Sequence, residues 1–370
     1  MVAAASVVVA VGTATGMISA LGEGRGSDEA RPEVTSSPSL EPLPNVPSVS
    51  PSPSASPSPK AKKKASAKPA PKKTDPKPRS APVSTSLYLH PQSRVLDWVR
   101  ANPGDPRHAV IKERIADQPA AVWFADYSPD TVTSRVRAIT AGGAAQGRVP
   151  VLVPYAIPDR DCGGHSQGGA PDLNAYDAWV DKFAAGLGSG EVIVILEPDS
   201  VAQAECLSAG QRADRFASLA RAGRVIKDAN PRARVYFDAG HSGWNSPATQ
   251  AGWLREAGAA STASSDGIFS NVSNFHSTAD EIAHNRAVLA ALGGPSSLGA
   301  VIDTSRNGAG APPDGQWCDP AGRKLGQAPT LSTGEARIDA YLWVKLPGES
   351  DGCKGAPGTF TASYAYELAR

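Results

Sequence analysis

Acidic residues follow three apolar runs of this sequence at the point where each run ends. The runs are 151–153, 192–196 and 341–345, and the acids after them are Asp159, Asp161, Glu197, Asp199, Glu349 and Asp351. A short apolar run rich in β-branched residues is typical of a buried strand. A carboxylate at the end of such a strand must be hydrogen-bonded, paired with a cation or used in chemistry. Acids at the same end of three strands are the arrangement of an α/β-barrel active site.

Two carboxyl groups that face one cleft can hydrolyse a glycosidic bond. One protonates the leaving oxygen, and the other activates water or attacks the sugar. Asp199 is the candidate acid because Pro198 restricts the backbone beside it and the strand end directs it toward a cleft. The alternative is that Asp199 only caps the next helix. Asp161 lies before a glycine-rich loop and could raise the pKa of a nearby acid by like-charge repulsion, or it could simply pair with Arg160.

Tryptophans near the predicted strand ends suit a saccharide cleft, because the apolar face of a sugar ring stacks on an indole. Trp123, Trp244 and Trp317 are the candidates, and for each the alternative is ordinary packing. Lys345 and Glu349 could hydrogen-bond to sugar hydroxyls, or they could form a surface salt bridge with each other.

The sequence gives little support for a metal site, a nucleophilic serine or a phosphate-binding site. His241 and His276 are isolated histidines, which rarely bind a metal. The sequence has no Gly-x-Ser-x-Gly nucleophile motif and no phosphate-binding loop. We therefore expect neither a metal nor a cofactor.

Seven apolar runs alternate with helical patterns, which predicts parallel β-α units. The runs are 121–126, 151–157, 192–196, 234–238, 267–270, 300–303 and 341–345. The clearest helical spacing is that of Tyr176, Trp179, Phe183 and Leu187. We expect an α/β fold, a distorted seven-stranded TIM-like barrel. An open doubly wound sheet is the alternative, but no Gly-x-Gly-x-x-Gly follows a strand.

Composition divides the chain of 370 residues into three parts. Residues 1–21 are uncharged and mostly small or apolar, which predicts a signal peptide or a membrane anchor. Residues 22–84 are rich in Pro, Ser and Lys, which predicts a disordered linker. Residues 85–370 form the predicted catalytic domain, and their slight net negative charge argues against nucleic-acid binding.

Four cysteines lie in the predicted domain, namely Cys162, Cys206, Cys318 and Cys353. An even number of cysteines in an exported chain indicates two disulfides, and spacing alone leaves all three pairings open. A zinc site is the alternative, but the spacing matches no common zinc motif.

Five segments in order resemble the family-six glycoside hydrolases, the cellulases, and in particular their bacterial endoglucanases. The segments are 157–162, 196–199, 238–241, 302–308 and 343–352. The resemblance extends from about residue 87 to the C-terminus. It implies a distorted β/α barrel and a metal-free, inverting hydrolysis of β-1,4-glucan.

The resemblance also implies roles for individual residues. Asp199 would be the general acid, and Asp161 would tune that acid and polarise water through a solvent chain. Asp351 would be the base, Asp238 would support the site, and Tyr155 would lie beneath the distorted sugar. The implied sugar-binding residues are Trp123, His241, Trp244, Asn274, Trp317, Lys345 and Glu349. The implied disulfides are Cys162–Cys206 and Cys318–Cys353.

Two positions depart from the family pattern. Gln167 stands where relatives often have a serine of the water chain, although Ser166 is next to it. Pro247 stands where tunnel-forming relatives have another sugar-stacking tryptophan.

We therefore expect a secreted, monomeric endo-β-1,4-glucanase that binds β-1,4-glucan or cello-oligosaccharides. Its N-terminus could tether it to a membrane or cell wall. An exo-acting cellobiohydrolase and a non-catalytic surface glucan-binding protein are the alternatives.

Overall fold

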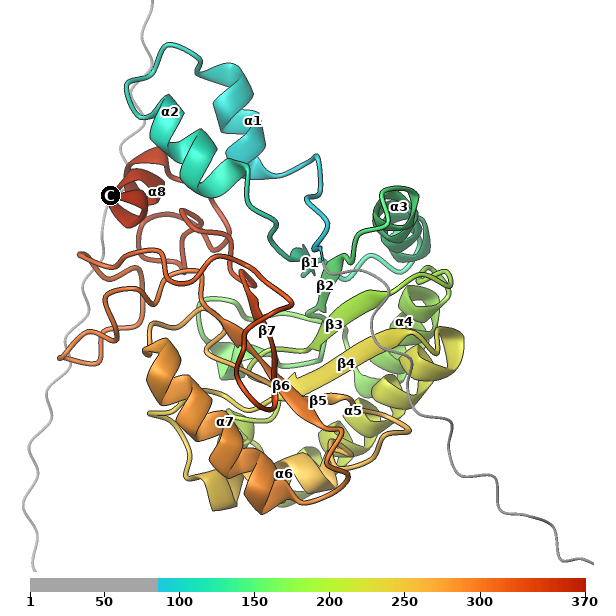
Figure 1. The fold of residues 1–370 in the computed structure, drawn as a ribbon. Coiled ribbons are helices and arrows are strands. Elements are labelled where there is room, and N and C mark those ends of the chain that lie inside the picture. The colour runs from blue at the N-terminus through green and yellow to red at the C-terminus, as the bar shows by residue number, and fades with distance from the viewer. Residues whose placement is uncertain (1–85) are drawn as a thin grey trace, which may run out of the picture. The chain divides into compact units, whose positions relative to one another are not determined.

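The computed structural model describes residues 86–370, and the predicted leader (1–21) and linker (22–84) lie outside the described residues. Seven strands form one parallel sheet whose neighbours follow the order of the chain (Figure 1). The strands are β1 (Val122–Phe124), β2 (Val151–Pro154), β3 (Val192–Leu196), β4 (Ala233–Asp238), β5 (Gly267–Ser270), β6 (Gly299–Asp303) and β7 (Ile338–Leu342). The predicted α/β barrel-like fold with seven strands is confirmed.

Helices connect the strands and cover the outside of the sheet (Figure 1). They are α1 (Arg94–Ala101), α2 (His108–Ile111) with the π-helical η1 (Lys112–Ala116), α3 (Val132–Ala145), α4 (Leu173–Ala184), α5 (Ala209–Ala229), α6 (Pro247–Glu256), α7 (Thr278–Leu292) and α8 (Ala362–Ala369). Two short 3₁₀ turns are η2 (Asp161–Gly163) and η3 (Ala204–Cys206).

Alternate residues of the strands belong to two separate hydrophobic clusters. Leu152 and Val194 pack with the helices, including Trp179 of α4. Val153 and Ile193 belong to the second cluster, on the opposite face of the sheet. This alternation follows from the two-residue period of a strand. Both faces of the sheet are therefore buried, as expected when helices cover a curved parallel sheet.

The sheet is not closed by a ladder between β7 and β1. Two hydrogen bonds join these ends instead: Ala121 N donates to Trp343 O at 2.9 Å, and Trp123 Nε1 donates to Val344 O at 2.7 Å. Helices α1, α2 and α8 pack beside this seam in a third cluster that includes Trp343 and Leu346. The seam therefore fixes Trp123 relative to the chain that follows β7.

The last strand begins three residues before the predicted run 341–345. It spans Ile338–Leu342, and it includes Asp339, whose charge interrupts the apolar pattern. The Asp339 carboxylate accepts a 2.8 Å hydrogen bond from the Tyr236 hydroxyl, which compensates for its position in the sheet.

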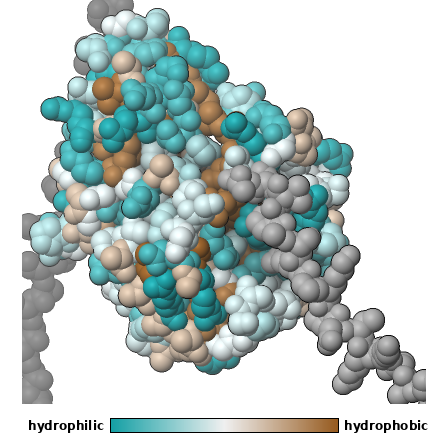
Figure 2. Space-filling model, viewed as in Figure 1, coloured by the Kyte–Doolittle hydropathy of each residue, from teal (hydrophilic) through white to brown (hydrophobic). Residues whose placement is uncertain are grey.

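The face of the described part shown in Figure 2 is largely polar. On the face shown in Figure 2, hydrophobic residues form small separate areas among hydrophilic ones. None of the helices between residues 86 and 370 has the length and apolar character needed to cross a membrane.

Candidate active site

The carboxyl ends of the parallel strands meet at one end of the sheet, and the predicted acids gather there. Asp238 is the last residue of β4, and Asp199 follows the end of β3. Asp161 lies in the loop after β2, and Asp351 lies in the loop after β7. The topology therefore places all four predicted catalytic acids around one mouth.

Asp199 occupies a tight turn in which its own φ is 67° and that of Glu197 is 49°. Left-handed backbone is unfavourable for residues with a side chain, so surrounding contacts must maintain this turn. Residues 200–203 form turns rather than a helix, so Asp199 does not cap one. Asp199 as a whole residue remains partly exposed to solvent.

The electrostatic surroundings of Asp199 favour its protonated form. Burial, followed by the negative charges of Asp238 and Asp161, raises the pKa of Asp199 well above its usual range. A hydrogen bond with Tyr155 acts in the opposite direction. An acid with a raised pKa and some solvent access has the properties of a proton donor.

Glu197 anchors the turn from the inside. Its fully buried carboxylate accepts hydrogen bonds from Ala156 N at 2.8 Å and Ile157 N at 2.9 Å. Burial raises the pKa of Glu197 to about 7, although these amides oppose the rise. Glu197 therefore joins the turn after β3 to the segment after β2, a structural role that the sequence did not reveal.

Asp238 holds the other side of the same turn. Its Oδ2 accepts hydrogen bonds from Val201 N at 3.1 Å and Ala202 N at 2.7 Å, and its Oδ1 accepts one from Gly240 N at 2.9 Å. Burial raises the pKa of Asp238, and the backbone amides act against this. The carboxylate thus both positions the turn and repels a negative charge on Asp199.

The loop that carries Asp161 is held by a disulfide and by an arginine. Cys162 is bonded to Cys206, and Ser166 N donates a 2.7 Å hydrogen bond to Asp161 Oδ2. Arg160 donates to the carbonyls of Tyr155, Ala125 and Ser166, and it forms no ion pair with Asp161. Asp161 therefore remains available to act on Asp199.

Asp351 belongs to a separate group of charges. Its Oδ2 lies 2.8 Å from Nη1 of the fully buried Arg306, and its Oδ1 lies 3.3 Å from Lys345 Nζ. The amide of Asp319 also donates to Asp351 Oδ2, at 3.2 Å. The structure thus brings Asp161 and Asp238 to Asp199, whereas the charge of Asp351 is directed toward two cations.

Asp319 shapes the loop around Asp351. Its carboxylate accepts hydrogen bonds from the hydroxyl of Ser350 at 2.6 Å and from the amides of Asp351, Cys353 and Lys354 at 2.8–3.0 Å. The second disulfide, Cys318–Cys353, joins the same two segments. Both disulfides are the pairs that the family resemblance implied. Asp319 was not predicted as a site residue from the sequence, because no apolar run precedes it.

Six of the seven predicted sugar-binding residues lie at this mouth in two groups, and Trp317 lies apart from them. Trp123 packs edge-on against Tyr155 at 5.3 Å between ring centroids, and Glu349 lines the same cavity as Trp123. Lys345 pairs with Asp351, so the surface salt bridge between Lys345 and Glu349 is not formed. Burial raises the pKa of Glu349 to about 7, against the influence of Lys345 and Arg94.

The second group lies after β4 and β5. His241 stacks on His276 at 4.2 Å and lies 5.2 Å from the Trp244 ring. Burial and His276 lower the pKa of His241 to about 3, so its imidazole is neutral at physiological pH. Asn274 Nδ2 donates to Val272 O at 3.2 Å, which directs its amide back to the loop.

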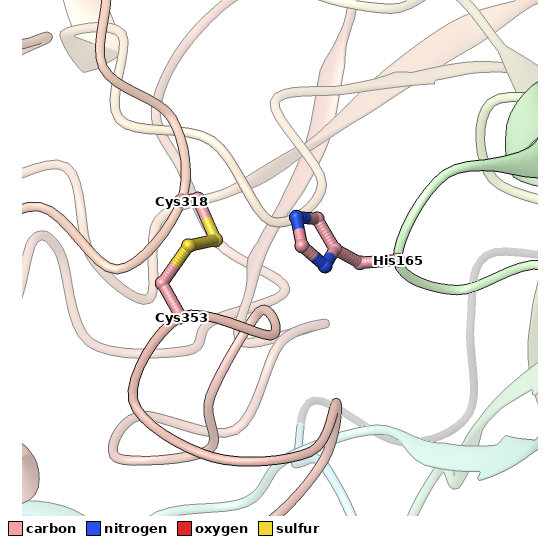
Figure 3. A group of neighbouring side chains, drawn as sticks. All are labelled: His165, Cys318 and Cys353. Atoms are coloured by element: carbon pink, nitrogen blue, oxygen red, sulfur yellow. A yellow bond between two sulfur atoms is a disulfide. The ribbon is translucent and has the colours of Figure 1, made fainter. Parts of the chain in front are cut away.

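Trp317 is 50% exposed, and the other large hydrophobic residues between 86 and 370 are buried or half-buried. His165, which sequence reasoning missed, lies 5.6 Å from its ring and beside the Cys318–Cys353 disulfide (Figure 3). The cysteine sulfurs are bonded to each other and so are not thiolate metal ligands. His165 therefore connects the loop of Asp161 with the loops after β6 and β7.

Comparison with known proteins gives consistent matches over the described part of the chain. Residues 83–366 match the model of the glycosyl hydrolases family 6. Endoglucanase 1 of Streptomyces sp. (strain KSM-9) is 52% identical over 77% of this chain and 78% of its own length. Endoglucanase A of Thermobispora bispora is 49% identical over 76% of this chain and 61% of its own length.

A solved structure shows the same fold. The endoglucanase Cel6 of Mycobacterium tuberculosis, in complex with methyl-cellobiosyl-4-deoxy-4-thio-β-D-cellobioside, aligns with a TM-score of 0.71 and 40% identity. The alignment covers 78% of this chain and 97% of that one.

Proposed function

Because the chain belongs to glycosyl hydrolase family 6, we propose that it is an inverting endo-β-1,4-glucanase that cleaves internal bonds of cellulose-like glucans. The family match confirms the membership that the five motifs predicted. The observation that carries the proposed chemistry is the position of Asp199 beside Asp161 and Asp238, whose charges favour its protonated form.

In the proposed reaction, Asp199 donates its proton to the oxygen of the glycosidic bond as that bond breaks. Tyr155, hydrogen-bonded to Asp199, lies beneath the sugar at the cleavage site. Asp161 and Asp238 keep the proton on Asp199 until the leaving oxygen takes it. Water attacks the anomeric carbon from the opposite face, which inverts the configuration there.

Asp161 is the proposed link to the attacking water. Its carboxylate is bound by the Ser166 amide, and the exposed Gln167 lies next in the loop. Ser166 could complete the chain of solvent that we expect in this family, in place of the serine that Gln167 replaces.

Asp351 is the proposed base, and its charged neighbours allow a direct test. Arg306 and Lys345 stabilise its carboxylate form, which is the form that accepts a proton from water. Azide needs no deprotonation, so it should restore turnover to an Asp351→Ala variant if Asp351 is the base. Failure of azide to restore any activity would assign Asp351 a purely structural role.

The proposed substrate groove runs past the aromatic and polar residues around the mouth, and they would bind β-1,4-glucan or cello-oligosaccharides. The sugar-binding residues that we propose are Trp123, His241, Trp244, Asn274, Trp317, Lys345 and Glu349.

An exo-acting cellobiohydrolase is the second candidate, because His165 brings the loop after β2 against Trp317. A loop that crosses the substrate would favour cleavage near a chain end threaded beneath the loop over cleavage of an internal bond. Viscosity of carboxymethyl-cellulose distinguishes the two: endo action lowers viscosity early, while few reducing ends have formed. A slow fall in viscosity that follows reducing-end release would favour the exo enzyme.

Proton NMR during hydrolysis of cellotetraose tests both catalysis and stereochemistry. We expect the new reducing ends to appear first as the α-anomer, inverted from the β-bond. Initial β-anomer would reject inversion, and no turnover would favour the non-catalytic glucan-binding protein.

We also propose that the enzyme is exported and monomeric, with residues 1–21 as a signal or anchor outside the described residues. N-terminal sequencing of protein from culture medium and from membranes distinguishes a cleaved signal from a retained anchor. Light scattering of the purified chain reports its oligomeric state.

A further inference from the structure

Three residues other than glycine adopt left-handed backbone in the segment that carries Asp161. The φ angles are 51° at Asp159, 57° at Asp161 and 46° at Cys162. This conformation is unfavourable for a residue with a side chain, and it persists only where surrounding contacts maintain it. The segment after β2 therefore needs restraints from other elements, and the same restraints determine where Asp161 lies.

Arg215 of α5 supplies one of these restraints. Its side chain is buried, and its Nη2 donates hydrogen bonds to the carbonyls of Pro158 at 2.7 Å and Asp159 at 3.2 Å. Hydrogen bonds from a charged donor are stronger than those between neutral groups, and a buried charge is costly unless such bonds compensate it. The guanidinium therefore fixes the two peptide groups that flank Asp159.

Glu197 holds the residues just before this point. Its carboxylate accepts hydrogen bonds from the amides of Ala156 and Ile157. Glu197 and Arg215 thus hold the four consecutive residues 156–159, one through amides and the other through carbonyls. Their opposite charges also attract each other in the protein interior. Removal of Arg215 would therefore release the half of the segment that leads directly into Asp161.

The start of α5 restrains the segment on the other side of Asp161. Cys162 is bonded to Cys206, which lies two residues before Ser208, the N-cap of α5. One helix is therefore joined to the segment by Arg215 before Asp161 and by the disulfide after it. This arrangement sets the position of Asp161 relative to α5, although no hydrogen bond from Arg215 reaches the Asp161 side chain.

We propose that Arg215 is a positioning residue, which keeps the Asp161 carboxylate close enough to Asp199 to act on it. The inference rests on the proposed function, because it assigns Arg215 a part in tuning the same general acid. Burial, then Asp238 and then Asp161 raise the pKa of Asp199, whereas a hydrogen bond with Tyr155 lowers it. Arg215 would act only through the position of Asp161.

The direction of the effect distinguishes this role from a direct action of the arginine charge. Loss of a positive charge near an acid raises the pKa of that acid, whereas loss of a negative charge near it lowers the pKa. Removing Arg215 should therefore lower the pKa of Asp199 if Asp161 moves away. It should raise that pKa if the guanidinium acts on Asp199 directly.

The pH profile of kcat/KM on cellotetraose tests the inference in Arg215→Met, which fills similar space but donates no hydrogen bond. The basic limb should move to lower pH by about 0.5–1 unit, a part of the roughly 1–3 units that one neighbouring charge can cause. Arg215→Lys keeps the charge, but its stem is one bond shorter and cannot bridge both carbonyls. Its basic limb should move in the same direction by less.

Arg221→Met is the matched control on the same helix. Arg221 is 33% exposed and pairs with Asp181 of α4 at 2.8 Å, so its loss leaves the segment after β2 in place. The basic limb of this variant should stay at its original pH. Thermal unfolding identifies which of the variants are folded.

Asp161→Asn separates failure of the inference from failure of the proposed function. This variant should move the basic limb to lower pH, and adding Arg215→Met should move it no further, because the charge that Arg215 positions is already gone. If the limb shifts in Asp161→Asn but not to lower pH in any folded Arg215 variant, the inference is overturned and the proposed function stands. A full further shift in the double variant would also overturn it. An unchanged limb in Asp161→Asn would instead reject the tuning of Asp199 in the proposed function.

Discussion

The Asp238 carboxylate accepts a 2.7 Å hydrogen bond from the backbone amide of Ala202, three residues after Asp199. One side chain thus fixes the turn that presents Asp199 and also contributes the negative charge that raises the pKa of Asp199. Position and protonation of the proposed acid are therefore coupled through a single residue.

Replacing Asp238 with Asn should separate these two effects. The Asn oxygen can still accept from the amides of Val201 and Ala202, but its NH₂ group cannot accept from Gly240 N, and the repelling charge is gone. The pKa of Asp199 should fall, so the basic limb of the pH profile of kcat/KM should move to lower pH. A basic limb that stays in place, in a variant with unchanged thermal unfolding, would show that the charge of Asp238 does not act on the proposed acid.

Glu197 should make stability depend on pH. Its folded-state pKa is raised from 4.5 to about 7, so the folded state binds a proton that the unfolded state has released. The free energy of unfolding should therefore fall as pH rises from 4.5 to 7, by on the order of 3 kcal/mol. Urea unfolding of Glu197→Gln should give a flatter dependence. Glu256→Gln, at an exposed glutamate, is the control, and equal slopes in both variants would refute the assignment.

The buried pair of Arg306 and Asp351 should contribute far more than a surface pair of similar geometry. Arg306→Ala leaves Lys345 as the cation that pairs with Asp351, and loss of one partner of a buried pair costs roughly 3–5 kcal/mol. Arg286 and Glu335 are 2.7 Å apart, close to the 2.8 Å of the buried pair, but their side chains are about 40% exposed, so Arg286→Ala should cost about 0–1 kcal/mol. Chemical unfolding compares the two variants, and equal losses would contradict the prediction.

His165 should restrain the loop that carries Asp161. A side chain at Gly352 would lie 2.9 Å from the His165 ring, so the contact between the two loops is close. In His165→Ala, amide hydrogen exchange should become faster within residues 161–169 and remain unchanged in α5. Exchange that does not differ from the unmodified protein would show that other contacts hold the loop.

Strand positions could be predicted because their apolar runs are short, β-branched and interrupted by turn residues. The run 192–196 matches β3 completely. The start of β7 was missed because Asp339 is paired with Tyr236 across the sheet, a contact that the local pattern does not contain. The spacing of apolar residues predicts which face of a strand is buried. A charged residue in the strand is therefore predicted to be exposed, even when a hydroxyl from a distant part of the chain compensates its charge.

The acids of the site could be proposed from their positions after strands and from family motifs. The sequence did not predict that these acids divide into two charge environments, one around Asp199 and one around Asp351. Arg306 lies within a recognised motif, but its ion pair with Asp351 depends on how two loops meet. His165 and Asp319 act through contacts with residues more than 30 positions away, and no spacing in the chain encodes those contacts.

The central claim is that Asp199 protonates the leaving oxygen, and the leaving-group dependence of Asp199→Ala tests it most directly. The measurement compares kcat/KM on cellotetraose with kcat/KM on dinitrophenyl cellobioside, whose phenolate departs without a proton. We predict a loss of about 10²–10⁴-fold on cellotetraose and a much smaller loss on the activated substrate. Equal losses on both substrates would contradict the account.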